Sequence, residues 1–320
     1  MGYSVIVEVE EIYYPILAAA GFPVNLVAIV ILSRRKCGLS KCITRYLVGM
    51  AAADLLVVFF DVILLRIKTH YLSLSLLLIT PVCCFTNVLR FAAIMVSVWL
   101  TVAFTFDRFV AICCEKLKMK YCTDKTAAVV LGVVSVLGCL ESVPVYFVYG
   151  PREVKNGVPW GCVPKASFYT SPEWTAFEIF HRLLTPCLPF LLVLLLNALT
   201  VRRVLATNKV RRRLRGDRSP KDPELENRRR SVVLLFAISG SFVLLWGTQV
   251  VSYLHQRIAT NYDMVSHPAR LVESTGTMLQ LLNSCTNTGV YLVTQSRFRE
   301  ELKNVLKYTF TRIIKLVKFK

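Results

Sequence analysis

Polar and charged side chains inside long apolar segments are the residues of this sequence best placed to do chemistry. Five of them interrupt residues 83–113: Arg90, Ser97, Thr101, Thr105 and Arg108. Their spacing is close to multiples of three or four, so a helix would carry all five on one face. At membrane depth, such a face turns toward other helices. The segment therefore predicts a central helix that connects a cysteine at one end to the Asp107-Arg108 pair at the other.

Asp54 is a second candidate for chemistry, because it stands within the apolar stretch AAADLL. An aspartate at the centre of a membrane helix costs about 2.5–3.5 kcal/mol on insertion scales. We therefore expect Asp54 to have polar partners or to bind an ion. The alternative is a protonated Asp54 that is only hydrogen-bonded to its neighbours.

The sequence lacks the residue patterns of the common catalytic sites. It contains no Gly-x-x-x-x-Gly-Lys phosphate loop and no His-Glu-x-x-His zinc motif, and its four histidines are widely separated. No nucleophile or metal-binding constellation can be assembled from it. We predict a protein that is not an enzyme and carries no organic cofactor.

Composition indicates a membrane protein. The 320 residues are 55% hydrophobic, and their mean hydropathy is +0.53. A soluble protein of this size would expose too much apolar surface. Seven apolar segments can be marked: 13–32, 45–66, 81–113, 126–148, 176–203, 230–256 and 269–293. The net charge of +19 does not indicate nucleic-acid binding, because the cations form short runs between these segments.

The distribution of Lys and Arg orients the segments. Of the 39 cations, 30 lie in 33–45, 108–125, 202–230 and 293–320. The positive-inside rule places these linkers in the cytoplasm and the N-terminus outside. We expect an extracellular N-terminus over 1–12, a bundle over 13–293, and an amphipathic helix with a basic cytoplasmic tail over 294–320. The tail helix should lie on anionic membrane lipid.

Only three of the 11 cysteines are expected near the outer, oxidising face: Cys83, Cys84 and Cys162. One disulfide from the outer end of the 81–113 segment to Cys162 is the expected pairing. The spacing of the residues leaves open whether Cys83 or Cys84 is the partner.

The chain resembles the class A (rhodopsin-like) G-protein-coupled receptors over nearly its whole length. The motifs that carry the resemblance are Asn25, Asp54, Cys83, Asp107-Arg108-Phe109, Pro189, Phe242 with Trp246, and Asn287 with Tyr291. One such motif is weak, but their shared order is specific. Thr248 and Thr288 depart from the pattern, because the family usually has prolines there. Residues 46–60, 97–113 and 281–299 are most similar to the group of orphan receptors that includes probable G-protein coupled receptor 139.

The resemblance implies an all-α membrane fold: a seven-transmembrane helix bundle with a short amphipathic eighth helix. It implies a plasma-membrane receptor for an extracellular small molecule or peptide, which activates heterotrimeric G proteins. Members of the similar group suggest an aromatic amino acid or peptide as ligand and the Gq class as partner. The family's spacing favours Cys83, 25 residues before Arg108, as the partner of Cys162.

The resemblance also assigns roles to residues. A polar network that could hold a sodium ion comprises Asp54, Ser97, Asn283, Ser284 and Asn287. Residues for switching and G-protein coupling are Asp107, Arg108, Phe109, Phe242, Trp246 and Tyr291. Sodium prefers hard oxygen ligands and would favour the inactive state.

Arg90 marks the expected ligand pocket, because it lies about five helical turns from Arg108 on the polar face. A cation there favours a carboxylate, supplied either by the ligand or by Asp61 or Glu141. An internal Arg90–Asp61 pair is the competing interpretation. The expected pocket residues are Arg90, Phe91, Asp61, Glu141, Trp246, Gln249, Tyr253 and Gln280.

Two other classes of membrane protein fit less well. A secondary transporter would bury similar charges but would show inverted repeats and broken helices, which are not recognisable here. A retinal-binding photoreceptor needs a lysine in the last segment, and residues 269–293 contain none.

Overall fold

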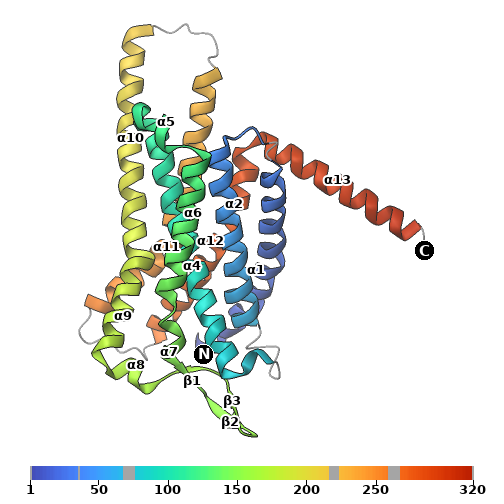
Figure 1. Cartoon of the computed structure of the whole chain (residues 1–320), viewed down its shortest axis with the longest axis vertical. Coiled ribbons are helices and arrows are strands. Elements are labelled where there is room, and N and C mark those ends of the chain that lie inside the picture. Colours follow the sequence, from blue (N-terminus) through green and yellow to red (C-terminus); the bar gives the residue numbers. More distant parts are fainter. Residues whose placement is uncertain (1, 35–36, 68–75, 216–222, 259–266, 319–320) are drawn as a thin grey trace.

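The computed structural model describes residues 2–34, 37–67, 76–215, 223–258 and 267–318, and these form a bundle of long helices (Figure 1). In chain order the bundle contains α1 (Gly2–Ser33), α2 (Lys41–Val57) with its continuation η1 (Val58–Ile67), α4 (Thr80–Cys113), α6 (Asp124–Ser142) followed by α7 (Val145–Val148), α9 (Pro172–Arg182) leading through η3 (Leu183–Cys187) into α10 (Leu188–Arg215), α11 (Pro223–Ile258) and α12 (His267–Thr294). The remaining elements are η2 (Leu76–Leu78), α5 (Glu115–Tyr121), β1 (Tyr149–Gly150), β2 (Glu153–Lys155), β3 (Val158–Trp160), β4 (Val163–Pro164), α8 (Ala166–Thr170) and α13 (Ser296–Lys318). β1 pairs with β4 and β2 with β3, both antiparallel.

Six of the described helical segments are long and apolar enough to cross a membrane: Val5–Ser33, Lys41–Ile67, Thr80–Cys113, Asp124–Val148, Pro172–Thr207 and Ser231–His255. α12 has sufficient length at 28 residues. It is less apolar because polar residues such as Gln280, Asn283 and Asn287 face the bundle. It packs against α1, α2 and α11 and so completes a seven-helix bundle. The predicted fold class is confirmed.

α4 occupies the centre of the bundle, as its polar face predicts. It packs against α2, α6, α10 and α11, and Leu100 and Phe104 on it are 2% and 0% exposed. These side chains join a core with Met50 and Tyr46 of α2 and Tyr291 of α12.

Three helices extend beyond the predicted boundaries. α1 begins at Gly2 instead of at residue 13, because no proline or glycine interrupts residues 3–14 and glutamate favours helix. Residues 2–12 therefore continue the first helix rather than forming a separate segment. α10 continues to Arg215 and α11 starts at Pro223, where proline suits the first helical turn. In Figure 1 both project beyond the neighbouring helices.

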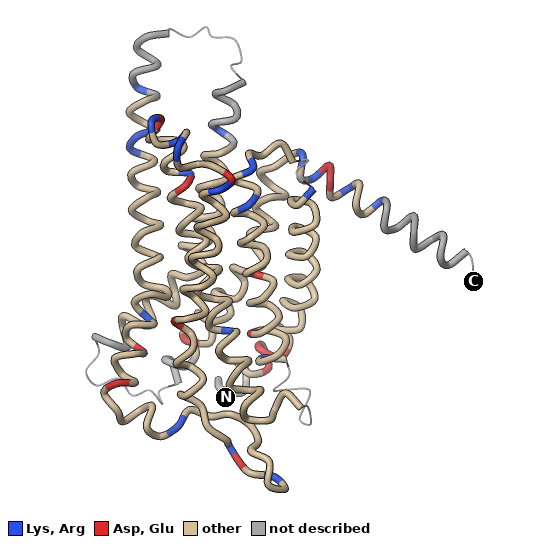
Figure 2. Tube along the Cα trace, viewed as in Figure 1, with Lys and Arg blue, Asp and Glu red and all other residues tan. Residues whose placement is uncertain are grey.

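Basic residues gather at one end of the bundle, where α5 and the start of α13 lie (Figure 2). We call this the basic end, and the opposite end, which contains Cys83 and Cys162, the disulfide end. α13 leaves the basic end sideways, as Figure 1 shows. Phe298 packs the start of α13 against the bundle. This side chain is 1% exposed, and its ring centroid is 5.9 Å from that of Tyr291.

A π-helical continuation of α2, η1, changes which residues share a face. Its i→i+5 hydrogen bonds bring residues five apart onto the same side. Asp61 and Arg66 are five apart in η1 and form an ion pair, with Arg66 Nε 3.2 Å from an Asp61 carboxylate oxygen. In an α-helix these two side chains would point in different directions.

Close packing of α6 on α4 depends on Gly138. A Cβ at Gly138 would lie 2.8 Å from Val96 Cγ2, whereas a Cβ at Gly132 on the same helix would have no neighbour within 4 Å. We expect Gly138→Val to destabilise the bundle by about 1–3 kcal/mol through overpacking. The matched variant Gly132→Val should leave stability within about 0.5 kcal/mol of the wild type. Thermal unfolding in detergent measures both, and equal melting temperatures would contradict this packing.

Candidate functional site

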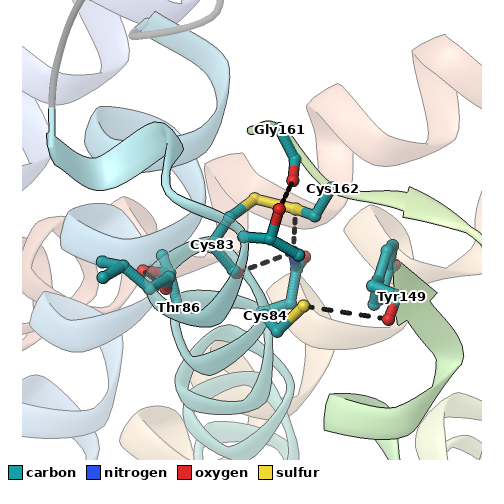
Figure 3. Close-up of a disulfide and its surroundings, with 9 residues drawn as sticks. Cys83, Cys84, Thr86, Tyr149, Gly161 and Cys162 are labelled. Carbon is teal, nitrogen blue, oxygen red and sulfur yellow. Dashed lines mark hydrogen bonds between the residues drawn. A yellow bond between two sulfur atoms is a disulfide. The ribbon is translucent and has the colours of Figure 1, made fainter. Parts of the chain in front are cut away.

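A disulfide joins Cys83, at the start of α4, to Cys162 in the β-hairpin region, as predicted. Figure 3 shows Cys84 pointing away from this bond, with its thiol 3.9 Å from the Tyr149 carbonyl oxygen. The open choice between Cys83 and Cys84 is therefore settled in favour of Cys83. Thr80 Oγ1 donates to the Gly161 carbonyl at 2.7 Å, so the loop is also hydrogen-bonded to the first turn of α4.

A cavity of about 450 Å³ lies inside the bundle at the disulfide end. We call it the disulfide-end cavity. Six of the eight predicted pocket residues line it: Asp61, Arg90, Phe91, Trp246, Gln249 and Gln280. They come from η1, α4, α11 and α12, so the topology brings together residues almost 220 positions apart. Volumes of about 300–1,000 Å³ are typical of small-molecule sites.

Asp61 lies between two arginines in this cavity. Its two carboxylate oxygens lie 3.2 Å from Arg66 Nε and 3.5 Å from Arg90 Nη1. Asp61 is 2% exposed, and the Arg90 side chain 15%. The Arg90 guanidinium also lies 4.5 Å from the ring centroid of Phe91. The internal Arg90–Asp61 pair therefore exists, but its distance is long for a charge-assisted hydrogen bond.

Three polar atoms of the cavity lining are buried without a hydrogen-bond partner among the described residues. They are Arg90 Nε, Trp246 Nε1 and Gln249 Oε1. An unmet buried donor or acceptor costs about 1–3 kcal/mol. Because all three residues line the same cavity, one polar ligand could satisfy them together.

Glu141 and Tyr253 do not line the cavity, which corrects their predicted role. Glu141 lies behind His181, whose Nδ1 is 2.8 Å from a Glu141 carboxylate oxygen. Tyr253 lies behind Arg182, whose guanidinium is 5.6 Å from the tyrosine ring centroid. The residues that they contact, His181 and Arg182, do line the cavity. The sequence pattern gave the right helix face but not the depth of each side chain.

Sequence reasoning missed most of the lining, and the missed residues include Arg66, Phe177, His181 and Arg182. His181 lies between the rings of Phe91 and Phe177, at centroid distances of 4.9 and 6.2 Å. A histidine and an arginine eight and seven residues before Pro189, in an otherwise apolar stretch, were the signal available. Arg66 could not be found from α-helical spacing, because η1 is π-helical.

Deeper in the bundle, Asp54 has the polar partners expected of it. Its carboxylate accepts hydrogen bonds from Ser97 Oγ at 2.5 Å and from Asn287 Nδ2 at 2.8 Å, and it is fully buried. Asn283, one turn from Asn287 on the same helix, has a buried Oδ1 without a partner among the described residues. Ser284 takes part through its backbone carbonyl, which accepts from Asn25 Nδ2 at 2.7 Å.

The oxygen atoms of these side chains, which include one carboxylate, are suitable ligands for a small hard cation. Asp54, Ser97 and the unpartnered Asn283 Oδ1 would hold it. No group of three or more His, Cys, Asp or Glu residues suited to a metal occurs in the described ranges. The arrangement therefore suits sodium better than a transition metal.

At the basic end, Arg108 is bound by its neighbour Asp107. Arg108 Nε and Nη2 both donate to an Asp107 carboxylate oxygen, and the arginine is 4% exposed. The thiol of Cys42 donates to the other carboxylate oxygen at 3.2 Å, and that of Cys122 donates to the Asp107 carbonyl at 3.5 Å. Burial, with the Asp107 charge, raises the pKa of Cys122 to about 12, so its thiol stays protonated as a donor.

The other predicted switch residues occupy separate places. Phe242 and Trp246 of α11 are buried, with ring centroids 5.6 Å apart. Tyr291 is fully buried, and its hydroxyl has no partner among the described residues. Phe109 lies apart from Arg108's ion pair and contacts Phe106, with ring centroids 6.4 Å apart.

Comparison with known proteins gives two findings. The model of the family described as "7 transmembrane receptor (rhodopsin family)" matches residues 24–291. The chain is 26% identical over 307 residues to a mouse protein named Probable G-protein coupled receptor 142. That alignment covers 93% of this chain and 73% of the mouse protein.

The disulfide should stabilise the disulfide end by closing a loop of 79 residues. We expect Cys162→Ser to lower the free energy of unfolding by about 4 kcal/mol in the chain-entropy model. Cys84→Ser, which removes the neighbouring thiol, should have a far smaller effect. Thermal unfolding and non-reducing peptide mapping measure the two variants. A Cys84–Cys162 peptide in the wild type, or equal melting temperatures for both variants, would argue against the assignment.

Proposed function

This chain belongs to the rhodopsin family of seven-transmembrane receptors, and we propose that it carries a signal from an extracellular ligand to a heterotrimeric G protein of the Gq class. Family membership makes it a multi-pass membrane receptor that couples to G proteins, and not an enzyme. The proposal adds to this a ligand, the Gq class of G protein and a location in the plasma membrane.

The proposed orientation has the disulfide end outside the cell and the basic end in the cytoplasm. Thirty of the 39 cations lie in the linkers 33–45, 108–125, 202–230 and 293–320, and the positive-inside rule would place these linkers in the cytoplasm. A disulfide persists on the oxidising side of the membrane, which supports the same orientation. The disulfide-end cavity would then be open to extracellular ligands.

The proposed ligand is a small molecule with a carboxylate and an aromatic group. The observation that carries this proposal is the buried Nε of Arg90, which has no hydrogen-bond partner among the described residues and belongs to the lining of a cavity of about 450 Å³. Asp61 contacts only the Nη1 side of the guanidinium, so a ligand carboxylate can bind the Nε side. Phe91, Phe177 and Trp246 supply aromatic surface in the same lining. An aromatic amino acid or the terminal residue of a peptide meets these requirements.

Signal transfer would run from Trp246 through Phe242 along α11. A ligand that contacts Trp246 Nε1 changes the packing of both rings, which lie in one cluster with Val98 and Val193. That change biases a two-state equilibrium of the bundle. The inner end of α11 then moves away from α4, and Arg108 becomes available to a G protein.

A sodium ion at Asp54, Ser97 and Asn283 would favour the inactive arrangement by linking α2, α4 and α12. Without the Asp54 carboxylate, sodium should no longer favour the inactive arrangement. We expect sodium to lower agonist affinity for the wild type relative to N-methylglucamine at equal ionic strength. Asp54→Asn should bind agonist with equal affinity in both salts. Wild-type affinity that does not change between the two salts would rule out the sodium site.

The ligand assignment is tested with a panel of G-protein dissociation sensors in cells, first without ligand and then with amino acids and peptides. We expect a carboxylate-bearing aromatic compound to activate the Gq sensor. Arg90→Gln and Arg90→Ala should then lower potency about tenfold or more, because a desolvated charge-assisted contact is lost. Amidation of the agonist carboxylate should lower potency at the wild-type receptor by the same factor. At the Arg90 variants, amidation should change potency little.

Arg66→Gln is the matched control, because it removes the other arginine beside Asp61. In this variant, agonist amidation should still lower potency about tenfold. If amidation costs the wild type no more than the Arg90 variants, Arg90 is structural. If no sensor responds and cells expressing the chain take up solute instead, the receptor proposal itself fails.

A further inference from the structure

A second cavity, of about 610 Å³, lies at the basic end between α2, α4, α5, α11 and α13. We call it the basic-end cavity. Three cations line it, Arg108, Lys118 and Arg297, and its described lining contains no aspartate or glutamate. The disulfide-end cavity differs, because its lining has three acids, Asp61, Glu178 and Glu273, beside its arginines.

Two of the three cations lack an acidic partner. Arg108 is paired with Asp107, but neither Lys118 nor Arg297 forms an ion pair with any described residue. Burial, and then the charge of Glu301, raise the pKa of Cys37, but Glu301 is not part of the lining. The lining of the cavity therefore includes two exposed positive charges that have no ion pair among the described residues, and these attract an anion.

Gly38 provides the space that Arg297 occupies at the cavity. It has a positive φ of 69°, and a Cβ there would lie 2.7 Å from Arg297 Nη1. A side chain at position 38 would thus displace the guanidinium. This turn holds Arg297, of α13, against the segment that precedes α2.

Groups that bind anions without a formal charge add to these cations. The hydroxyl residues Ser40, Ser231 and Ser296 line the cavity. Ser40 caps the N-terminus of α2, and Ser296 begins α13, so two long helices start at the cavity. Helix N-termini favour negative charge, and that effect adds to the attraction of Lys118 and Arg297.

We propose that the basic-end cavity binds a small polyanion with at least two phosphate monoesters, such as an inositol phosphate. Two separate cations and two helix starts suit several phosphate groups better than one carboxylate. The anion can be free in the cytoplasm or can be the headgroup of a membrane phosphoinositide. Its binding does not depend on the proposed ligand or G-protein class. A bound anion would occupy the side of Arg108 that a G protein needs.

Binding is measured with the full chain in nanodiscs of phosphatidylcholine, which has no net charge. In the first arm, the soluble probe is inositol trisphosphate, and its binding is measured by calorimetry. In a second arm, the nanodiscs contain phosphatidylinositol bisphosphate, and its protection of the chain against thermal unfolding is measured. We expect saturable binding in at least one arm, and binding in the lipid arm alone assigns the anion to the headgroup.

Lys118→Gln and Arg297→Gln should each weaken binding about tenfold through the loss of one charge-assisted contact. The matched controls are Lys120→Gln on α5 and Lys303→Gln on α13, since both residues are exposed like Lys118 and Arg297 but lie outside the lining. These controls should change affinity less than twofold.

No saturable binding in either arm would overturn the proposal. Equal losses in the controls and in the lining variants would also overturn it, because the anion would then bind the basic surface in general. A third contrary result is reduced G-protein coupling in the lining variants with unchanged anion binding, which would assign the cavity to the G protein alone. The binding assay uses no signalling readout, so failure of the proposed function would leave its result interpretable.

Discussion

A charged side chain inside a low-dielectric bundle is costly unless it has an opposite charge or a hydrogen-bond partner. In this chain, residues of α4 make three of these contacts. Arg90 faces Asp61 near one end, Ser97 donates to Asp54 in the middle, and Arg108 binds Asp107 near the other. Each contact is made on the same face of one helix. Because truncating one partner would leave a buried charge unmatched, the positions of α2 and α4 relative to each other are strongly restrained. The other helices pack around this pair.

The two cavities differ in how completely their charges are matched. At the disulfide end, acids and arginines are intermixed, and the unmet groups are single polar atoms such as Arg90 Nε. This arrangement favours a ligand that is oriented by a few hydrogen bonds. At the basic end, Lys118 and Arg297 have no ion pair among the described residues, which favours a ligand that is selected by its charge. The same bundle thus offers a specific site and an electrostatic one, with the Asp54 network between them.

Much of this could be predicted from the sequence, because helical periodicity and membrane energetics are both strong constraints. They identified the polar face of α4, the need of Asp54 for partners, and the segments of the bundle. The Cys83–Cys162 bond followed from the family's spacing. Periodicity failed where the backbone departs from the α-helix, as with Arg66 in η1. It also failed where depth matters more than direction: Glu141 lies on the expected face, but His181 stands between it and the cavity. The basic-end cavity was not foreseen, since its lining combines residues of α2, α4, α5, α11 and α13.

The polar character of α12 has a consequence for how the chain enters the membrane. Unlike the other six bundle helices, α12 is too polar over its described residues to be recognised as a membrane span from its hydropathy. A segment of this composition partitions poorly into lipid by itself. Its side chains reach groups on earlier helices, with Asn287 on Asp54 and Asn25 on the Ser284 carbonyl. Insertion of the last helix at the translocon therefore depends on helices that have already entered the bilayer. Biogenesis of the chain is cooperative, and the buried polar contacts that serve the mature bundle also retain its final helix.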